Sequence, residues 1–157
     1  MRRPGRRLPV VVAGVTLAGV LTGCGGSSEA EGDADGGLDR AADLSTCTAD
    51  AQPAAQPYGD AFPSDWPFPP RTVVFAVEDR GGDGTIVTGV SSAPFAAVLD
   101  HLNTDVVGAG FVIEQGETEE HDAEAEWEGN GFRGRWAIRE SAQCAGETVI
   151  QVLSAAD

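Results

Sequence analysis

The most chemically suggestive stretch of the sequence is a run of carboxylates around one of the two histidines, from Glu117 to Asp122 (ETEEHD, with His121). Carboxylate oxygens and an imidazole nitrogen can together bind a divalent cation. The spacing matches no recognised ligand motif, however, and a solvated acidic turn between two strands has the same composition. Residues 33–36 (DADG) and the pair Asp79 and Asp83 have the spaced aspartates of a calcium loop but do not continue to the required glutamate. We therefore expect no metal site, and whether the Glu117–Asp122 run binds a cation stays open.

The second histidine, His101, is followed four residues later by Asp105. An imidazole oriented by a carboxylate can act as a general base. The same spacing is also typical of a pair of side chains on the surface of a helix, and we favour that interpretation. Ser91 and Ser92 lack the Gly-x-Ser-x-Gly frame of a nucleophile, so we expect Ser92 to cap a helix. Glycosidase-type carboxylate pairs are defined by their distance in space and stay an open alternative. The sequence thus predicts no catalytic residue and no cofactor.

Three tryptophans are the candidate ligand contacts: Trp66, Trp127 and Trp136. Their rings could stack on a sugar or an apolar ligand, although Trp127 and Trp136 stand at alternating strand positions, where aromatic residues are more often core. Trp66 lies in residues 47–70, which hold six of the nine prolines. Proline disfavours helix and central strand, so this segment is either a proline-rich recognition motif or a strap packed on the domain. We favour the second interpretation and call residues 47–70 the strap.

Residues 71–157 show the periodicities of a folded domain. Strands are expected at 72–77 and 85–90, joined by a glycine- and aspartate-rich turn, and then at 111–115 and 148–153. Between them, apolar residues recur every three or four positions from Phe95 to Val106, which predicts a helix ended by Gly108 and Gly110. The predicted fold is therefore α+β. We expect two layers, with one helix packed on a mainly antiparallel sheet of five to six strands in the order ββαβββ.

The strongest local prediction is a hairpin around Asn130-Gly131. Residues 123–128 alternate apolar and acidic side chains, and residues 132–139 alternate apolar and basic ones. A two-residue turn at Asn130-Gly131 sets Glu128 opposite Arg133. The same register pairs Glu126 with Arg135 and Asp122 with Arg139, whereas a turn at Gly129-Asn130 would pair Glu126 with Arg133. Either turn leaves Trp127, Trp136 and Ile138 on the face directed to the core.

The N-terminus has the layout of an export signal. Four arginines precede an uncharged apolar run over residues 8–21, which is shorter than the roughly 20 residues of a spanning helix. The run ends in Leu21-Thr22-Gly23-Cys24, which resembles the lipobox of bacterial lipoproteins at all four positions. The resemblance implies that the signal peptide, residues 1–23, is cleaved before Cys24 and that the Cys24 thiol is lipidated. Diacylglycerol and palmitate-type chains would then anchor the protein to the extracytoplasmic face of the cell membrane. General and twin-arginine export both stay open.

Charge limits the partners that this chain can have. All 25 acidic residues but only six of the ten basic ones follow Cys24, so that part of the chain carries a net charge of −19. Such a chain is repelled by polyanions, which makes nucleic acid an unlikely partner. Residues 24–46 are rich in Gly, Ser, Asp and Glu and lack large apolar side chains apart from two leucines, so we expect a disordered tether behind the lipid anchor.

Two cysteines remain after Cys24, namely Cys47 and Cys144. Exported proteins reside where disulfides persist, and two cysteines allow one pairing. A Cys47–Cys144 bond would close a loop of the chain, and the chain-entropy model predicts that this stabilises the folded state by about 4–5 kcal/mol.

The sequence favours a membrane-anchored lipoprotein with a small domain that binds a ligand or envelope protein without catalysis. One alternative is an envelope hydrolase that uses the acidic cluster or a histidine. Another is a structural or assembly spacer. Ligand, partner and oligomeric state are not specified by the sequence.

Overall fold

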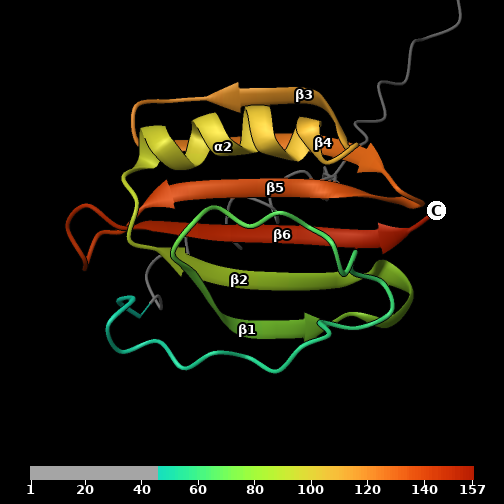
Figure 1. The fold of residues 1–157 in the computed structure, drawn as a ribbon, viewed down its shortest axis with the longest axis horizontal. Coiled ribbons are helices and arrows are strands. Elements are labelled where there is room, and N and C mark those ends of the chain that lie inside the picture. Colours follow the sequence, from blue (N-terminus) through green and yellow to red (C-terminus); the bar gives the residue numbers. More distant parts are fainter. Residues whose placement is uncertain (1–45) are drawn as a thin grey trace, which may run out of the picture.

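The computed structural model describes residues 46–157, which form one α+β unit (Figure 1). The predicted signal peptide, Cys24 and nearly all of the predicted tether lie outside the described residues. Within the described residues, no helix is both long enough and apolar enough to cross a membrane.

One α-helix and six strands make up the unit, together with a short 3-10 turn. Their bounds are β1 Thr72–Asp79, η1 Gly81–Asp83, β2 Thr85–Ser91, α2 Phe95–Gly108, β3 Val112–Thr118, β4 Asp122–Gly129, β5 Phe132–Glu140 and β6 Thr148–Ala156. The class and the single helix between the second and third strands agree with the sequence prediction. The predicted order ββαβββ is one strand short, because four strands follow the helix and the order is ββαββββ.

The six strands form a single antiparallel sheet in the order β1-β2-β6-β5-β4-β3. Strand β6, the last along the chain, lies between β2 and β5. It therefore joins the β1–β2 hairpin to the three consecutive strands β3, β4 and β5. Val87 on β2, Val152 on β6 and Trp136 on β5 stand side by side in one row across these strands. All three side chains are buried, so this row is the centre of the core.

The β4–β5 hairpin has the predicted register. Glu128 lies opposite Arg133 and Trp127 opposite Gly134. Asn130 and Gly131 have φ angles of 55° and 84°, as a two-residue primed turn requires. Trp127 and Trp136 are each only 1% exposed, so they are core residues.

The ion pairs on the opposite face of this hairpin differ in part from the prediction. Arg139 pairs with Asp122 at 3.9 Å, as expected. Arg135 pairs instead with Glu124, diagonally across the ladder, and Arg133 lies 3.8 Å from Asp157. Because an arginine side chain is long and flexible, it reaches acceptors beyond the residue directly opposite.

Helix α2 begins differently from the prediction. Pro94 is its N-cap and makes no side-chain cap hydrogen bond, so Ser92 does not cap the helix. Ser91 has a hydroxyl that accepts a hydrogen bond from the backbone N–H of Ala93 at 3.1 Å and donates one to the strap carbonyl of Pro70 at 3.2 Å. The helix buries Phe95, Val98, Leu102 and Val106 against the sheet, which is the apolar face that the spacing predicts.

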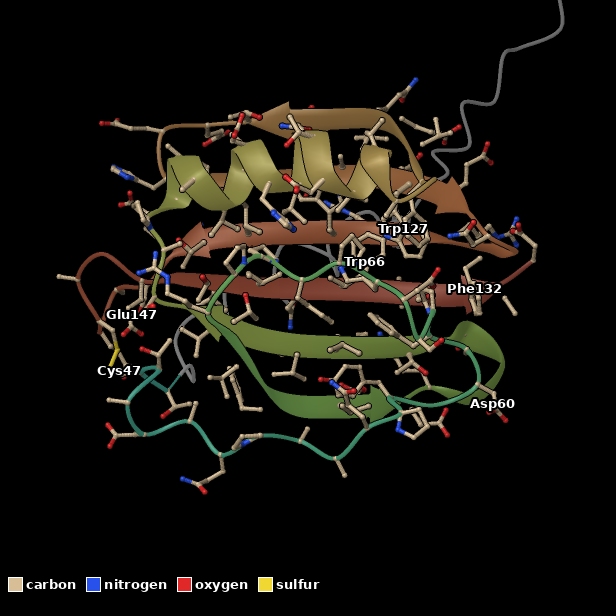
Figure 2. All side chains as sticks on the ribbon, in the orientation of Figure 1. Cys47, Asp60, Trp66, Trp127, Phe132 and Glu147 are labelled. Carbon is tan, nitrogen blue, oxygen red and sulfur yellow. A yellow bond between two sulfur atoms is a disulfide. The ribbon has the colours of Figure 1, made fainter. Side chains whose placement is uncertain are left out.

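The strap covers the part of the sheet that α2 leaves open. From Cys47 it runs along the outer edge of β1, where the N–H of Ala54 bonds to the carbonyl of Val74 at 2.8 Å, and it then turns back across β2 and β6 beside α2 (Figure 1). Its Phe62 and Trp66 are buried members of the core. Figure 2 shows Trp66 beside Trp127, and their ring centroids are 4.5 Å apart. The strap is thus packed on the rest of the unit through two of its aromatic side chains.

Candidate functional site

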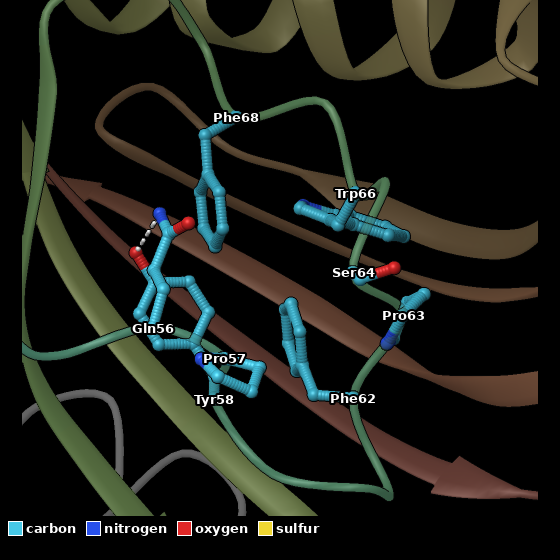
Figure 3. Close-up of a pocket in the computed structure, with 8 residues that line it drawn as sticks. All are labelled: Gln56, Pro57, Tyr58, Phe62, Pro63, Ser64, Trp66 and Phe68. Atoms are coloured by element: carbon cyan, nitrogen blue, oxygen red, sulfur yellow. Dashed lines mark hydrogen bonds between the residues drawn. The ribbon is translucent and has the colours of Figure 1, made fainter.

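A pocket of about 370 Å³ is formed within the returning part of the strap (Figure 3). This volume is near the lower end of the range for small-molecule sites, about 300–1,000 Å³. No charged side chain lines the pocket. Its walls are Gln56, Pro57, Tyr58, Phe62, Pro63, Ser64, Trp66 and Phe68.

Aromatic rings define the shape of the pocket. The Tyr58 ring stands edge-on to Phe62 and to Phe68, with centroids 5.8 and 6.1 Å away. Phe62 and Phe68 are nearly parallel, at an interplanar angle of 7° and a centroid distance of 6.0 Å. Trp66 meets Phe62 at 6.4 Å on the remaining side. Perpendicular and offset arrangements are the favourable ones for aromatic pairs, so the rings hold one another in place.

The polar groups of the pocket are few and neutral. The Gln56 amide donates a hydrogen bond of 3.0 Å to the Tyr58 hydroxyl, and Ser64 is an exposed residue of the lining. The indole nitrogen Nε1 of Trp66 is buried and has no hydrogen-bond partner. Figure 3 shows this nitrogen on the side of the indole that is turned toward Phe68 and the pocket. The indole nitrogens of Trp127 and Trp136 in the core are also buried without a partner, so the unpaired state is not specific to the pocket.

The strap is fixed at its start by the disulfide Cys47–Cys144, which the sequence predicted and which joins residues 97 positions apart. Beside it, both the backbone N–H and the hydroxyl of Thr48 donate to the carboxylate of Glu147, at 2.9 and 2.5 Å. Figure 2 shows Cys47 and Glu147 together at one end of the sheet. These bonds attach the strap to the loop between β5 and β6.

The strap is fixed at its end by β1 and β2. The Thr72 hydroxyl donates to the Pro69 carbonyl at 2.7 Å, and the Ser91 hydroxyl donates to the next carbonyl, that of Pro70. Arg71 between them adopts a φ of 65°, which turns the chain from the strap into β1. The pocket therefore lies on a segment that is held at both ends.

His101 is a third attachment point rather than a free base. Its Nε2 lies 2.8 Å from the carbonyl oxygen of Pro67 in the strap, and its Nδ1 lies 3.3 Å from the Asp105 carboxylate. The side chain is only 14% exposed. Both ring nitrogens face acceptors, and His101 lines neither this pocket nor the acidic one described below. Its position supports the interpretation as a helix-surface pair and adds a contact to the strap.

The predicted acidic cluster does not converge on one point. His121 is 62% exposed and pairs with Glu140 at 3.0 Å and with Glu120 at 3.7 Å. Among residues 46–157, the single group of three or more close potential metal ligands is Cys47, Cys144 and Glu147. Its two sulfur atoms are joined in the disulfide, so they are not available as thiolates.

A second, acidic cavity of about 590 Å³ lies over β3 and β4, on the far side of the hairpin from the core. Glu114, Glu117, Glu124 and Glu126 line it together with Arg135, which pairs with Glu124. No histidine lines this cavity. Each histidine does pair with a carboxylate, His101 with Asp105 and His121 with Glu140, but neither pair lines this cavity or the strap pocket.

The remaining candidates have structural positions. Asp79 accepts a hydrogen bond from the N–H of Gly81 at 2.8 Å, which stabilises the β1–β2 turn. Of the three tryptophans, only Trp66 lines the pocket, because Trp127 and Trp136 lie beneath it in the core.

Sequence reasoning missed three aromatic members of the pocket as site residues, Tyr58, Phe62 and Phe68. The available signal was their interleaving with prolines, which stiffen the backbone and can hold rings apart to leave a cavity.

No protein-family model, curated protein or solved structure matches the chain. Its function is therefore argued from the pocket itself.

Proposed function

We propose that this chain is a lipid-anchored extracytoplasmic protein that binds a small neutral ligand, without catalysis, in the pocket of the strap. The observation that carries the proposal is an uncharged, aromatic-lined pocket of about 370 Å³ whose lining includes the exposed polar residues Gln56 and Ser64. Binding sites typically combine apolar walls with a few such polar groups.

The proposed location rests on the sequence. The lipobox at Leu21-Thr22-Gly23-Cys24 would give a lipidated Cys24, and an exported domain is the setting in which a Cys47–Cys144 disulfide persists. In this proposal, residues 24–46 are a tether that holds the domain away from the membrane.

We further propose that α2 and the strap form one layer and the sheet the other, so that the pocket opens on the layer opposite the hairpin's charged face.

The location is tested by mass spectrometry of native protein from a membrane fraction. We expect a diacylglyceryl mass on an N-terminal Cys24 peptide, and we expect Cys24→Ser to leave the protein out of that fraction. A native N-terminus elsewhere, with no lipid on Cys24, would contradict the anchor.

The binding site is tested by NMR on the full-length chain in detergent. The three tryptophans give three indole N–H signals, and Trp66→Phe identifies the one from the pocket. In a screen of neutral fragments that carry an oxygen acceptor, we expect hits to move the Trp66 signal. Tyr58→Ala and Phe68→Ala should abolish these shifts, since both rings line the pocket and are only partly buried.

The matched control is Val112→Ala, which removes an apolar side chain that is 54% exposed and lies outside the pocket. Hits should bind this variant unchanged. If no fragment moves the Trp66 signal, or if hits bind the Tyr58 and Phe68 variants equally well, the strap pocket is not a binding site.

A further inference from the structure

The two edges of the sheet differ in what lies beside them. The sheet ends in β1 on one side and in β3 on the other. The strap runs along β1, where the N–H of Ala54 donates to the carbonyl of Val74. Among residues 46–157, no backbone hydrogen bond reaches β3 from the side away from β4. A terminal strand presents N–H and C=O groups with which a further strand can pair, so β3 offers an open place in the sheet (Figure 1).

Strand β3 has a bulge that places a cavity beside this open edge. The strand contains neither lysine nor proline, the residues that most often block pairing at an edge. Between Ile113 and Gly116 its register with β4 shifts, so that Glu114 and Gln115 both lie opposite Glu126. Three of these residues and Gly116 line the acidic cavity of about 590 Å³. Because a bulge changes the direction of side chains, it gives this edge a specific pocket.

The charge of the cavity favours a cationic partner. Glu114, Glu117 and Glu126 are exposed carboxylates of the lining. Glu124 also lines the cavity and pairs with Arg135. Four carboxylates therefore face one guanidinium, which leaves a surplus of three negative charges. A neutral segment laid over them would remove water from unpaired charges, whereas lysine or arginine side chains would compensate them.

A second copy of this chain does not fit the same edge. Pairing of two β3 strands would bring Glu114 and Glu117 of both copies together, and like charges on neighbouring strands are destabilising. The net charge of −19 after Cys24 adds a repulsion at longer range. The occupant must therefore differ from this chain in the sign of its charge.

From these observations we infer that the edge of β3 is the docking site of a cationic, extended segment of another protein. The segment adds to the sheet beside β3, and its backbone takes up the free hydrogen-bonding groups of that strand. Its lysine or arginine side chains enter the acidic cavity on the face of the sheet away from the core. This surface shares no lining residue with the strap pocket, so the inference does not depend on the proposed binding function.

The experiment is an NMR titration of the full-length chain in detergent with capped seven-residue peptides, a length that matches β3. The first peptide alternates lysine and threonine, so that all its lysines lie on one face of a strand. The second has proline in place of threonine, which keeps the charge but removes every second N–H and disfavours strand pairing. The third has glutamate in place of lysine.

We expect the lysine–threonine peptide to shift the backbone amide signals of β3. It should also slow the hydrogen exchange of those β3 amides that point away from β4, which attraction by charge alone would not do. The proline peptide should bind about tenfold more weakly, since it loses backbone hydrogen bonds, and the glutamate peptide should not bind. Added salt should weaken binding, because the carboxylates at this edge are exposed.

Substitutions test the contribution of the cavity. Glu114→Gln with Glu117→Gln should weaken binding of the lysine–threonine peptide about tenfold, the equivalent of two exposed ion pairs. The matched control is Asp50→Asn with Asp60→Asn, which removes the same charge from exposed positions of the strap and should leave the affinity nearly unchanged. Arg135→Gln should strengthen binding severalfold, because it removes the cation that already lies in the cavity.

The inference is overturned if the lysine–threonine and proline peptides bind equally and hydrogen exchange in β3 is not slowed. It is also overturned if the glutamate variant binds as tightly as the aspartate control. If calcium or magnesium chloride moves the signals of the cavity residues and the peptides do not, the cavity is a cation site instead. If the β3 amides are protected before peptide is added and the chain is dimeric, the edge is a contact between copies.

Discussion

Gly134 allows a sharp test of how the hairpin packs on the core. It lies in β5, between Trp127 of β4 and Ser154 of β6, on the face directed to α2 and the strap. A Cβ atom at this position would stand 3.0 Å from Cζ2 of Trp127 and 2.8 Å from the backbone carbonyl carbon of Leu153, closer still to the carbonyl oxygen. The indole therefore occupies the space that a side chain would need.

We expect Gly134→Ala to destabilise the protein by about 3 kcal/mol, the upper end of the usual range for overpacking. The indole can shift, but the Leu153 carbonyl belongs to the β5–β6 ladder and cannot move without breaking it. For a domain of about 100 residues this change lowers the melting temperature by roughly 10–20 °C.

Urea unfolding followed by circular dichroism measures the effect. Gly108→Ala is the control, because a Cβ there meets nothing within 4 Å and the residue ends α2. Alanine is the better helix former, so this control should be neutral or up to about 1 kcal/mol more stable. The reasoning is refuted if the free energy of unfolding of Gly134→Ala lies within about 0.5 kcal/mol of that of the parent, as expected for a loosely packed site. The contact between Trp127 and Gly134 would then not restrain the sheet.

Three further outcomes are expected. Cys47→Ser with Cys144→Ser should cost at most about 4–5 kcal/mol in urea unfolding, because the bond closes a loop with a sequence separation of 97; an unchanged midpoint would contradict this. Ser91→Ala should lower the free energy of unfolding by about 1–3 kcal/mol, because it removes a buried hydroxyl that makes two hydrogen bonds. Ser92→Ala should leave the free energy of unfolding nearly unchanged, since Ser92 does not cap α2. If Ser92→Ala destabilises the protein more than Ser91→Ala, Ser92 is the cap after all. His101→Ala should release part of the strap and lower the free energy of unfolding by about 1–2 kcal/mol. Limited proteolysis should then cut the strap faster than the sheet. Equal rates of cleavage in both would show that His101 does not hold the strap.

The hairpin was predictable because its determinants are local. Alternating side chains and the Asn130-Gly131 turn set the register within a few residues, and nothing distant competes with them. The start of α2 was less predictable, since Ser91 and Ser92 are both possible caps by residue type. Their roles depend on where the strap carbonyls lie, which no local pattern encodes.

The position of β6 and the pocket were not predictable for a related reason. Strand β6 is the last in chain order but pairs with β2 and β5, and no periodicity specifies which strands are neighbours. The strap has no helical or strand period at all, so its path depends on contacts such as Trp66 with Trp127. The sequence could identify Trp66 as a candidate, but the cavity beside it exists only after the strap has folded back.

The central place of β6 has a consequence for how this protein is made. A chain synthesised from its N-terminus presents β1 with β2 and later β3, β4 and β5, but these are two separate pieces until β6 arrives between them. In the complete sheet, Val87 of the first piece and Trp136 of the second stand on opposite sides of Val152 of β6, so the central row of the core needs all three strands. The complete six-stranded sheet therefore cannot form until translation has passed Ala156.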